Sequence, residues 1–159
     1  MKKRVSVCVL TLLVSVGCAS RPTESPEEVF TSFKEALQKD DFETVWQHVC
    51  ALTRDEAERN AKAVREADTR EQVTIAATLH VTREEMKNMD GRAFLRAQAT
   101  AAMTHPGSPW SLIRKAEFGR VEIEGARAVV YVTIDGKEQG HCLRMVLEDN
   151  QWRIRFAGS

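Results

Sequence analysis

The stretch that decides the fold is Lys115–Phe156, KAEFGRVEIEGARAVVYVTIDGKEQGHCLRMVLEDNQWRIRF. It contains four runs in which apolar and polar residues alternate, separated by tight turns at Glu124-Gly125, Asp135-Gly136 and Asp149-Asn150. Alternation with a period of two is typical of half-buried strands, and Asp-Gly is a strong signal for a two-residue hairpin turn. The stretch therefore predicts an antiparallel meander of four strands.

Pairing the strands outward from these turns predicts which face of the sheet is buried. Leu147 then lies opposite Trp152, and Met145 lies opposite Ile154. A slip of one residue would turn every apolar side chain towards solvent, so the alternation specifies the face. The predicted core face carries Val121, Ile123, Ala128, Val130, Val132, Ile134, Leu143, Met145, Leu147, Trp152, Ile154 and Phe156.

The charge balance of the chain gives no reason to expect a nucleic-acid partner. The sequence has 159 residues with 23 basic and 23 acidic side chains, and it is 43% apolar and 29% charged. These proportions are typical of one globular domain with a real core. Because three of the basic residues stand in the first four positions, the rest of the chain is weakly acidic, and such a surface does not attract phosphate backbones.

The first residues are typical of an exported protein. Lys2-Lys3-Arg4 precedes an apolar run, Val5–Val16, which has the length of a signal peptide and is too short for a membrane span of about 20 residues. The run ends at Ser15-Val16-Gly17-Cys18, which resembles a bacterial lipobox with serine where leucine is most common. The resemblance implies that residues 1–17 are removed, that Cys18 is lipidated and that residues 18–25 form a tether. An ordinary secretory signal with a fortuitous cysteine is the alternative.

Helices are predicted between the tether and the meander. Ser25-Pro26-Glu27-Glu28 is a capping box with proline at the first helical position, and an apolar stripe at helical spacing follows as far as Leu37. Lys39-Asp40-Asp41 breaks this helix, and a second one runs to Cys50. A third helix is predicted from Thr53 to Ala67.

The region between residues 69 and 109 is predicted as further helices and a loop. Val73–Val81 is rich in β-branched residues but lies among helical patterns and is predicted as helix, and Thr82-Arg83-Glu84-Glu85 is a second capping box. Another helix is predicted around Phe94–Ala102, and residues 105–109 read as a loop. Helices first and a meander last predict an α+β fold, with the helices packed on one face of a curved antiparallel sheet.

With these elements, the chain resembles the NTF2-like superfamily, which is also called cystatin-like or SnoaL-like. The matching features are the two N-terminal helices joined by a short acidic break, the strand Gly125–Val130 and the closing Gln151–Ile154. The resemblance implies a single domain over residues 26–159, in which the sheet wraps around the helices as a cone with a pocket at its wide end. The middle, residues 53–103, departs from the family, which often has a hairpin there.

Three residues are predicted to line a ligand pocket in such a cone: His141, Trp46 and Phe33. The predicted register places His141 on the core face opposite Val130, where it would serve as a pocket base or a polar anchor. A buried histidine that donates to a backbone carbonyl, or a solvated histidine at the sheet edge, fits the same position. Trp46 fits both a core position and a ligand platform.

No catalytic residue, metal ligand or cofactor site is assigned from the sequence. Enzymes of the isomerase branch use an acid as the base, with a tyrosine and a second acid as oxyanion donors, whereas the single tyrosine, Tyr131, is predicted on the opposite face of the sheet. The four histidines share no metal-ligand spacing, and the chain has no glycine-rich phosphate loop.

Two cysteines, Cys50 and Cys142, remain after the leader is removed and Cys18 is lipidated. Both are predicted to stay unpaired, because Cys142 pairs with Val129 on the outer face while Cys50 lies on a core-facing helix stripe. A bulge at Gly140 would turn Cys142 inward and allow a disulfide.

The outer face of the predicted sheet is too apolar to be purely solvated. It is predicted to place Phe118 and Gly140 opposite Tyr131, Val146 opposite Arg153, and Glu122 opposite Arg127. Such a face fits either an ordinary half-exposed sheet or a surface for a protein partner or a second copy of the chain.

Two function classes are compatible with these observations. The first is a lipid-anchored protein of the bacterial cell envelope, whose non-catalytic NTF2-like domain binds a small ligand or a protein partner. The second is an envelope enzyme similar to SnoaL or ketosteroid isomerase, with His141 as its base. The first is favoured, because no acid/base constellation accompanies the lipobox-like leader. Ala19 is not the aspartate that retains lipoproteins on the inner membrane, so the resemblance implies the outer membrane, facing the periplasm.

Overall fold

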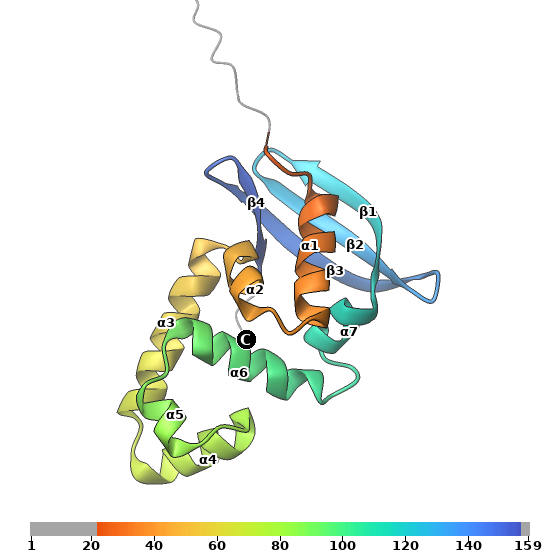
Figure 1. Ribbon diagram of the computed structural model, residues 1–159. Helices are drawn as coiled ribbons and strands as arrows, with labels where there is room; N and C mark the ends of the chain where they lie inside the picture. The colour runs from red at the N-terminus through yellow and green to blue at the C-terminus, as the bar shows by residue number, and fades with distance from the viewer. Residues whose placement is uncertain (1–21, 157–159) are drawn as a thin grey trace, which may run out of the picture.

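The computed structural model describes residues 22–156 (Figure 1). The prediction of an α+β fold, with helices ahead of an antiparallel meander, is confirmed. In chain order the elements are α1 (Pro26–Gln38), α2 (Phe42–His48), α3 (Ala51–Glu66), α4 (Thr69–Leu79), α5 (Arg83–Lys87), α6 (Gly91–Met103), α7 (Pro109–Lys115), β1 (Glu117–Glu124), β2 (Arg127–Ile134), β3 (Lys137–Glu148) and β4 (Gln151–Arg155).

The four strands lie in the order β1-β2-β3-β4, and two of the three predicted turns are where the sequence puts them. Asp135 and Gly136 have φ of 52° and 71°, and Asp149 and Asn150 have φ of 48° and 63°. Positive φ at both central residues is the requirement of the hairpin turn whose twist matches that of the strands. The first turn is Gly125-Ala126, one residue later than predicted.

The register of β1 differs from the predicted one by two residues, because of that later turn. Ile123 pairs with Ala128 and Val121 with Val130. A shift of two residues leaves the same side chains on each face, since alternation also has a period of two. The predicted pairing of Glu122 with Arg127 is therefore wrong, but the predicted face is not.

A bulge at Gly119 corrects the position of Phe118. The register shifts between Phe118 and Arg120, so that Phe118 pairs with Val132 and turns towards the helices instead of outward. Its ring centroid lies 6.1 Å from that of Phe30. A Cβ atom on Gly119 would lie 2.9 Å from the carbonyl oxygen of Tyr131, so only glycine fits there.

The register between β2 and β3 also shifts by two residues, between Tyr131 and Thr133. Tyr131 pairs with Cys142 and Val130 with Leu143, so the predicted pairings of Cys142 with Val129, His141 with Val130 and Gly140 with Tyr131 are wrong. Beyond this irregular segment, Met145 pairs with Ile154 and Leu147 with Trp152, as predicted.

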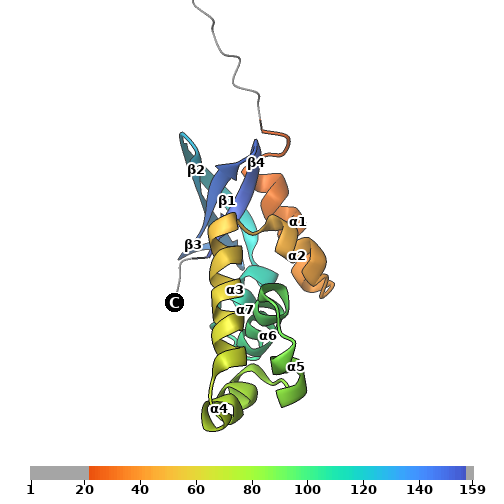
Figure 2. The same ribbon diagram turned by 90° about the vertical axis from the view of Figure 1, so that its left-hand side faces the viewer.

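The core lies between one face of the sheet and α1, with α2 and α7 beside it, and it continues among the helices α3–α6 (Figures 1 and 2). Phe33 of α1, Trp110 of α7 and Phe156 after β4 meet there, and the last two rings stack with centroids 4.4 Å apart. Ile123 departs from the predicted core face with 56% of its surface exposed, because it lies next to the β1–β2 turn on an edge strand. The buried sheet residues are Ala128, Val130, Val132, Leu143, Met145, Trp152 and Ile154.

The remaining helices, α3 to α6, form a lobe beyond the end of the sheet (Figure 1). The helix predicted for Val73–Val81 is confirmed as α4, which Asp68 and Glu71 start with a reciprocal capping box. The helix predicted to begin at Thr53 begins earlier, at Ala51, and its first backbone N–H donates to both carboxylate oxygens of Glu148 at 3.0 and 3.2 Å. A cap from a residue this distant in sequence is invisible to local patterns.

Two further features position the ends of the elements. The short helix α7 was not predicted; Ser108 caps it and Pro109 occupies its first turn. The segment between α2 and α3 runs beside β4, with a parallel bridge between Val49 and Ile154 and a hydrogen bond of 2.8 Å from the Cys50 N–H to the Ile154 carbonyl.

Candidate functional site

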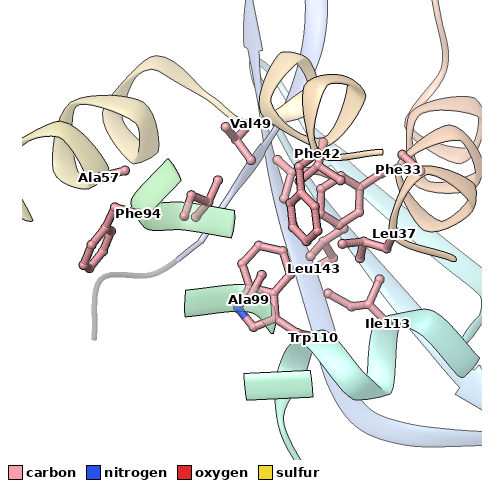
Figure 3. Close-up of a cluster of buried hydrophobic side chains, with 14 of the residues drawn as sticks. Phe33, Leu37, Phe42, Val49, Ala57, Phe94, Ala99, Trp110, Ile113 and Leu143 are labelled. Carbon is pink, nitrogen blue, oxygen red and sulfur yellow. The ribbon is translucent and has the colours of Figure 1, made fainter. Parts of the chain in front are cut away.

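The structure does not gather the three predicted pocket residues around a cavity. Phe33 is completely buried and contributes to the aromatic cluster of the core (Figure 3). Trp46 is half-buried and packs against that core. The backbone of His141 lies in the irregular segment of β3, and its side chain is outside the described part of the structure. Neither Phe33 nor Trp46 lines any of the four cavities described below.

A cavity of about 320 Å³ lies instead where β4 ends, between α7 and the edge of β3. We call it the α7–β3 groove. β4 pairs with β3 only from Glu148 back to Arg144, whereas β3 itself begins at Lys137. The cavity lies beside the part of β3 that precedes Arg144, and residues of α7 line its other side. The groove is lined by Pro109, Leu112, Ile113, Val132, Cys142, Leu143, Arg144, Arg155 and Phe156.

The walls of the α7–β3 groove combine apolar side chains with two cations. Ile113, Val132 and Leu143 are buried and Leu112 and Phe156 are half-buried, so the inner wall is hydrocarbon. The exposed Cys142, Arg144 and Arg155 come from the opposite face of the sheet and lie at the solvent side. The groove therefore offers an apolar wall with a positive rim.

Arg144 and Arg155 lie directly opposite each other on β3 and β4. Like charges in directly opposed positions destabilise an antiparallel pair. Neither guanidinium has a hydrogen-bond or ion-pair partner among residues 22–156. The positive charge of the rim is thus uncompensated by the part of the chain that the structure describes.

Sequence reasoning did not single out Arg144 and Arg155, although the signal was present. The predicted pairing of Leu147 with Trp152 already places Arg144 opposite Arg155. Outward-facing charged residues usually do no more than solvate a surface, so the pair stands out only once the apolar wall of α7 is seen beside it.

The half of the outer sheet face that surrounds Arg120 satisfies its own charges. The Arg120 guanidinium lies over the Tyr131 ring, 3.5 Å from its centroid, and donates to Glu122 and, at 3.4 Å, to Glu138. The Tyr131 hydroxyl donates to Glu122 at 3.0 Å. The hydrogen bonds from Arg120 and then from Tyr131 lower the pKa of Glu122. This half of the face is an internally paired network.

A buried serine–histidine pair joins α1 to the end of α2. The Ser32 hydroxyl and His48 Nε2 are 2.9 Å apart, and only 8% of His48 is exposed. Its Nδ1 is buried without a hydrogen-bond partner among the described residues. Burial lowers the pKa of His48, with a smaller opposing effect of Glu24 and a further lowering by Arg153. Since neither residue lines a cavity described here, the pair is a structural link between the helices.

The helical lobe carries two larger and more open cavities. One, of about 1220 Å³, lies against α4, α5 and α6 and mixes acidic with basic side chains, with an ion pair between Arg92 and Glu43. The other, of about 690 Å³, lies between α3, α4 and α6, and Ile75, Leu79 and Phe94 supply its apolar surface. Neither gathers unpaired charge of one sign beside an apolar wall as the α7–β3 groove does.

The two cysteines that the structure describes are free thiols, as predicted. Cys50 is buried, with its Sγ 3.3 Å from the Thr53 hydroxyl, and Cys142 is exposed at the groove. The predicted lipidation site, Cys18, lies outside residues 22–156.

Within residues 22–156, no helix has the length and apolarity that a membrane crossing needs. In the same range, no three histidine, cysteine, aspartate or glutamate side chains come together as a metal site. Comparisons of the chain with protein-family models, with curated proteins and with solved structures find no match.

Proposed function

We propose that this chain is a lipid-anchored protein of the bacterial cell envelope, whose single NTF2-like domain binds a small ligand or a protein partner without catalysis. The observation that carries the binding function is the α7–β3 groove, where an apolar wall adjoins the uncompensated Arg144 and Arg155. Solvation of the surface explains neither the apolar wall nor the placement of two like charges directly opposite each other. Binding of a ligand would explain both.

The proposed NTF2-like cone is supported by the order and packing of the elements. α1 and α2 precede the sheet, α1 covers one face of it, and the meander closes the chain. The aromatic side chains of Phe33, Trp110 and Phe156 fill the space where a cone would hold its pocket, so the ligand site is proposed at the end of β4.

The first described residues and the groove lie at opposite ends of β4. The N–H of Thr23 donates to the Asn150 carbonyl at 3.2 Å, so the described chain starts beside the β3–β4 turn (Figure 1). The α7–β3 groove lies past the other end of β4, at Arg155. Lipidation at Cys18 in the outer membrane would therefore hold the groove away from the bilayer and open to the periplasm.

The outer face of the sheet is the proposed surface for a protein partner or a second copy. Val129, Tyr131 and Val146 are half-buried there, between the paired Arg120 network on one side and unpartnered Arg127 on the other. A half-buried centre with a charged rim is the usual anatomy of a transient interface.

Substitution of Cys18 tests the anchor, with Cys8→Ala in the leader as the matched control. The wild-type chain and Cys8→Ala are expected to leave membranes only with detergent and to carry the mass of the acyl chains. Cys18→Ala is expected to be soluble or uncleaved, because the acceptor thiol is gone. Unchanged mass and fractionation of Cys18→Ala would refute the lipoprotein proposal.

A further inference from the structure

We propose that the α7–β3 groove binds a small amphiphile with an anionic head group, a carboxylate or a phosphate, which Arg144 and Arg155 hold together. This inference rests on the proposed binding function and specifies its ligand class. The hydrocarbon part of the ligand lies against Leu112, Leu143 and Phe156, which the groove brings next to the arginines.

The head-group assignment follows from the opposition of the two arginines. A guanidinium presents a planar fork of N–H donors that matches carboxylate and phosphate oxygens, and it cannot lose its charge at physiological pH. An anion between Arg144 and Arg155 would accept from both and would relieve their repulsion across the strands. A neutral polar ligand would leave that repulsion in place.

Comparison with the other arginines of the sheet shows that only these two combine the lack of a partner among residues 22–156 with a place at a cavity, since Arg127 also has no partner but does not line the groove. Arg120 is bound to Glu122 and Glu138, and Arg153 donates to the Gln47 carbonyl and to Gln151. Those arginines have structural partners. Arg144 and Arg155 have none among residues 22–156, and both line the same cavity.

The apolar wall and the volume of the groove indicate what the hydrocarbon part of the ligand can be. Three buried residues, Ile113, Val132 and Leu143, form the wall opposite the arginines. The groove measures about 320 Å³, at the lower end of the range of about 300–1,000 Å³ that is typical of ligand pockets. A short alkyl chain fits this space, whereas a polyanion such as nucleic acid would make no use of the wall.

Alkylation of Cys142 reports on occupancy of this groove. Cys142 is exposed and lines the groove, whereas Cys50 is completely buried. The full chain, held in phosphatidylcholine vesicles, is treated with iodoacetamide in the presence of octanoate, octyl phosphate or uncharged 1-octanol. Mass spectrometry of the Cys142 peptide then gives the rate of modification with each probe.

Octanoate is expected to slow the alkylation of Cys142 several-fold, and 1-octanol at the same concentration is expected to leave it unchanged. The two charged probes distinguish the head groups: protection at a lower concentration of octyl phosphate assigns a phosphate, and the reverse assigns a carboxylate. Either order supports the proposal, because both head groups are anionic and accept from two guanidinium groups.

Substitutions at the arginines test the head-group contacts. Arg144→Gln and Arg155→Gln are each expected to raise the half-protecting concentration about tenfold, the usual effect of losing one hydrogen bond to a charged group. Arg127→Gln is the matched control, since Arg127 is exposed and unpartnered on the same face but does not line the groove. Each rate is normalised to that of the same variant without ligand. All three side chains are exposed, so folding is expected to persist and is checked by circular dichroism.

Three results would overturn the inference. They are equal protection by 1-octanol and octanoate, an equal loss of protection in Arg127→Gln, and no protection by either anion up to its solubility limit. Equal protection by the alcohol would leave the proposed binding function intact and remove only the head-group assignment. The fractionation of Cys18→Ala is independent of all three, so failure of the anchor and failure of this inference are distinguishable.

Discussion

The sheet layer, which comprises α1, α2, α7 and β1–β4, and the helical lobe, α3–α6, are held together in different ways. In the sheet layer, α1 is 13 residues long and buries Pro26, Val29, Phe30, Phe33, Ala36 and Leu37. In the lobe, α4 is 11 residues long and buries only Leu79. The sheet layer is thus stabilised mainly by apolar burial, and the outer part of the lobe is not.

In the outer part of the lobe, hydrogen bonds at the helix ends make up a larger share of the stabilisation, although α1 of the sheet layer has a capping box as well. Asp68 with Glu71 starts α4, and Thr82 with Glu85 starts α5, each as a reciprocal capping box. A cap contributes about 0.5–2 kcal/mol, whereas burial of a large apolar side chain contributes about 1.5–3 kcal/mol. Elements with few buried contacts open locally at low free energy. The outer part of the lobe, α4 and α5, is therefore expected to open before the sheet layer does.

The tryptophans allow the two regions to be followed separately. Trp46, Trp110 and Trp152 lie in α2, α7 and β4, which all belong to the sheet layer. Tryptophan fluorescence therefore reports on that layer, while far-ultraviolet circular dichroism reports on the helices of both regions. A urea transition that begins earlier by circular dichroism than by fluorescence would establish the difference.

The largest expected effect is that of Trp152→Ala in the sheet layer. Trp152 is buried against the core as predicted, so truncation should cost about 3–5 kcal/mol of unfolding free energy through lost burial and a cavity. The matched change in the lobe is Val73→Ala on α4, where 55% of the side chain is exposed and the expected cost is below about 0.5 kcal/mol. Urea melts give both values, and similar costs would mean that the two regions do not differ in burial.

A smaller effect is expected for Glu148→Ala, which cuts a connection between the two regions. The Glu148 carboxylate on β3 accepts from the first N–H of α3, and its negative charge lies at the positive end of that helix. Its loss should cost about 0.5–2 kcal/mol, the usual range for a helix cap. Glu124→Ala, an exposed glutamate on β1, is the control and should change stability little. Hydrogen exchange should accelerate in the first turn of α3 only in Glu148→Ala; equal exchange in both variants would contradict the cap.

The smallest effect is a pH dependence of the sheet layer that His48 causes. Burial holds the pKa of folded His48 below its ordinary value of 6.5, so the unfolded chain takes up the proton first as pH falls. The contribution of neutral, buried His48 to the free energy of unfolding is therefore present above pH 6.5 and is lost progressively as the pH falls below it. Urea midpoints from tryptophan fluorescence should therefore fall between pH 7.5 and 5.5 in the wild type and fall less in His48→Gln. Parallel slopes would show that His48 titrates alike in both states.

The sequence predicts those parts of the fold that short-range chemistry decides. The turns at Asp135-Gly136 and Asp149-Asn150, and the first cap at Ser25, are specified by residues within four positions of each other. The register between β1 and β2 is wrong by two residues because the turn falls one residue later than predicted. The register between β2 and β3 is wrong by two residues because the irregularity between Tyr131 and Thr133 depends on the partner strand. The faces survive those errors because both shifts are even, except at Phe118, which the bulge at Gly119 turns to the other face.

The candidate site was less accessible to prediction than the fold. The opposition of Arg144 and Arg155 follows from the hairpin register, but their relation to Leu112 depends on how α7 folds back against the end of β4. A family resemblance directs attention to the interior of a cone, whereas here Phe33 and Trp110 pack against each other in the core. The position of a cavity depends on how side chains from elements far apart in the sequence pack together. Short-range sequence patterns do not contain that information.

The parallel bridge between Val49 and Ile154 bears on how this protein behaves when many copies are crowded together. An open sheet edge recruits strands from other chains and starts aggregation. Here the segment of the same chain around Val49 lies along the β4 edge at Ile154. The β1 edge carries the charged residues Glu117, Arg120, Glu122 and Glu124. For molecules concentrated on a membrane surface, as proposed for this chain, the covered β4 edge at Ile154 and the charged β1 edge would both disfavour growth by strand addition.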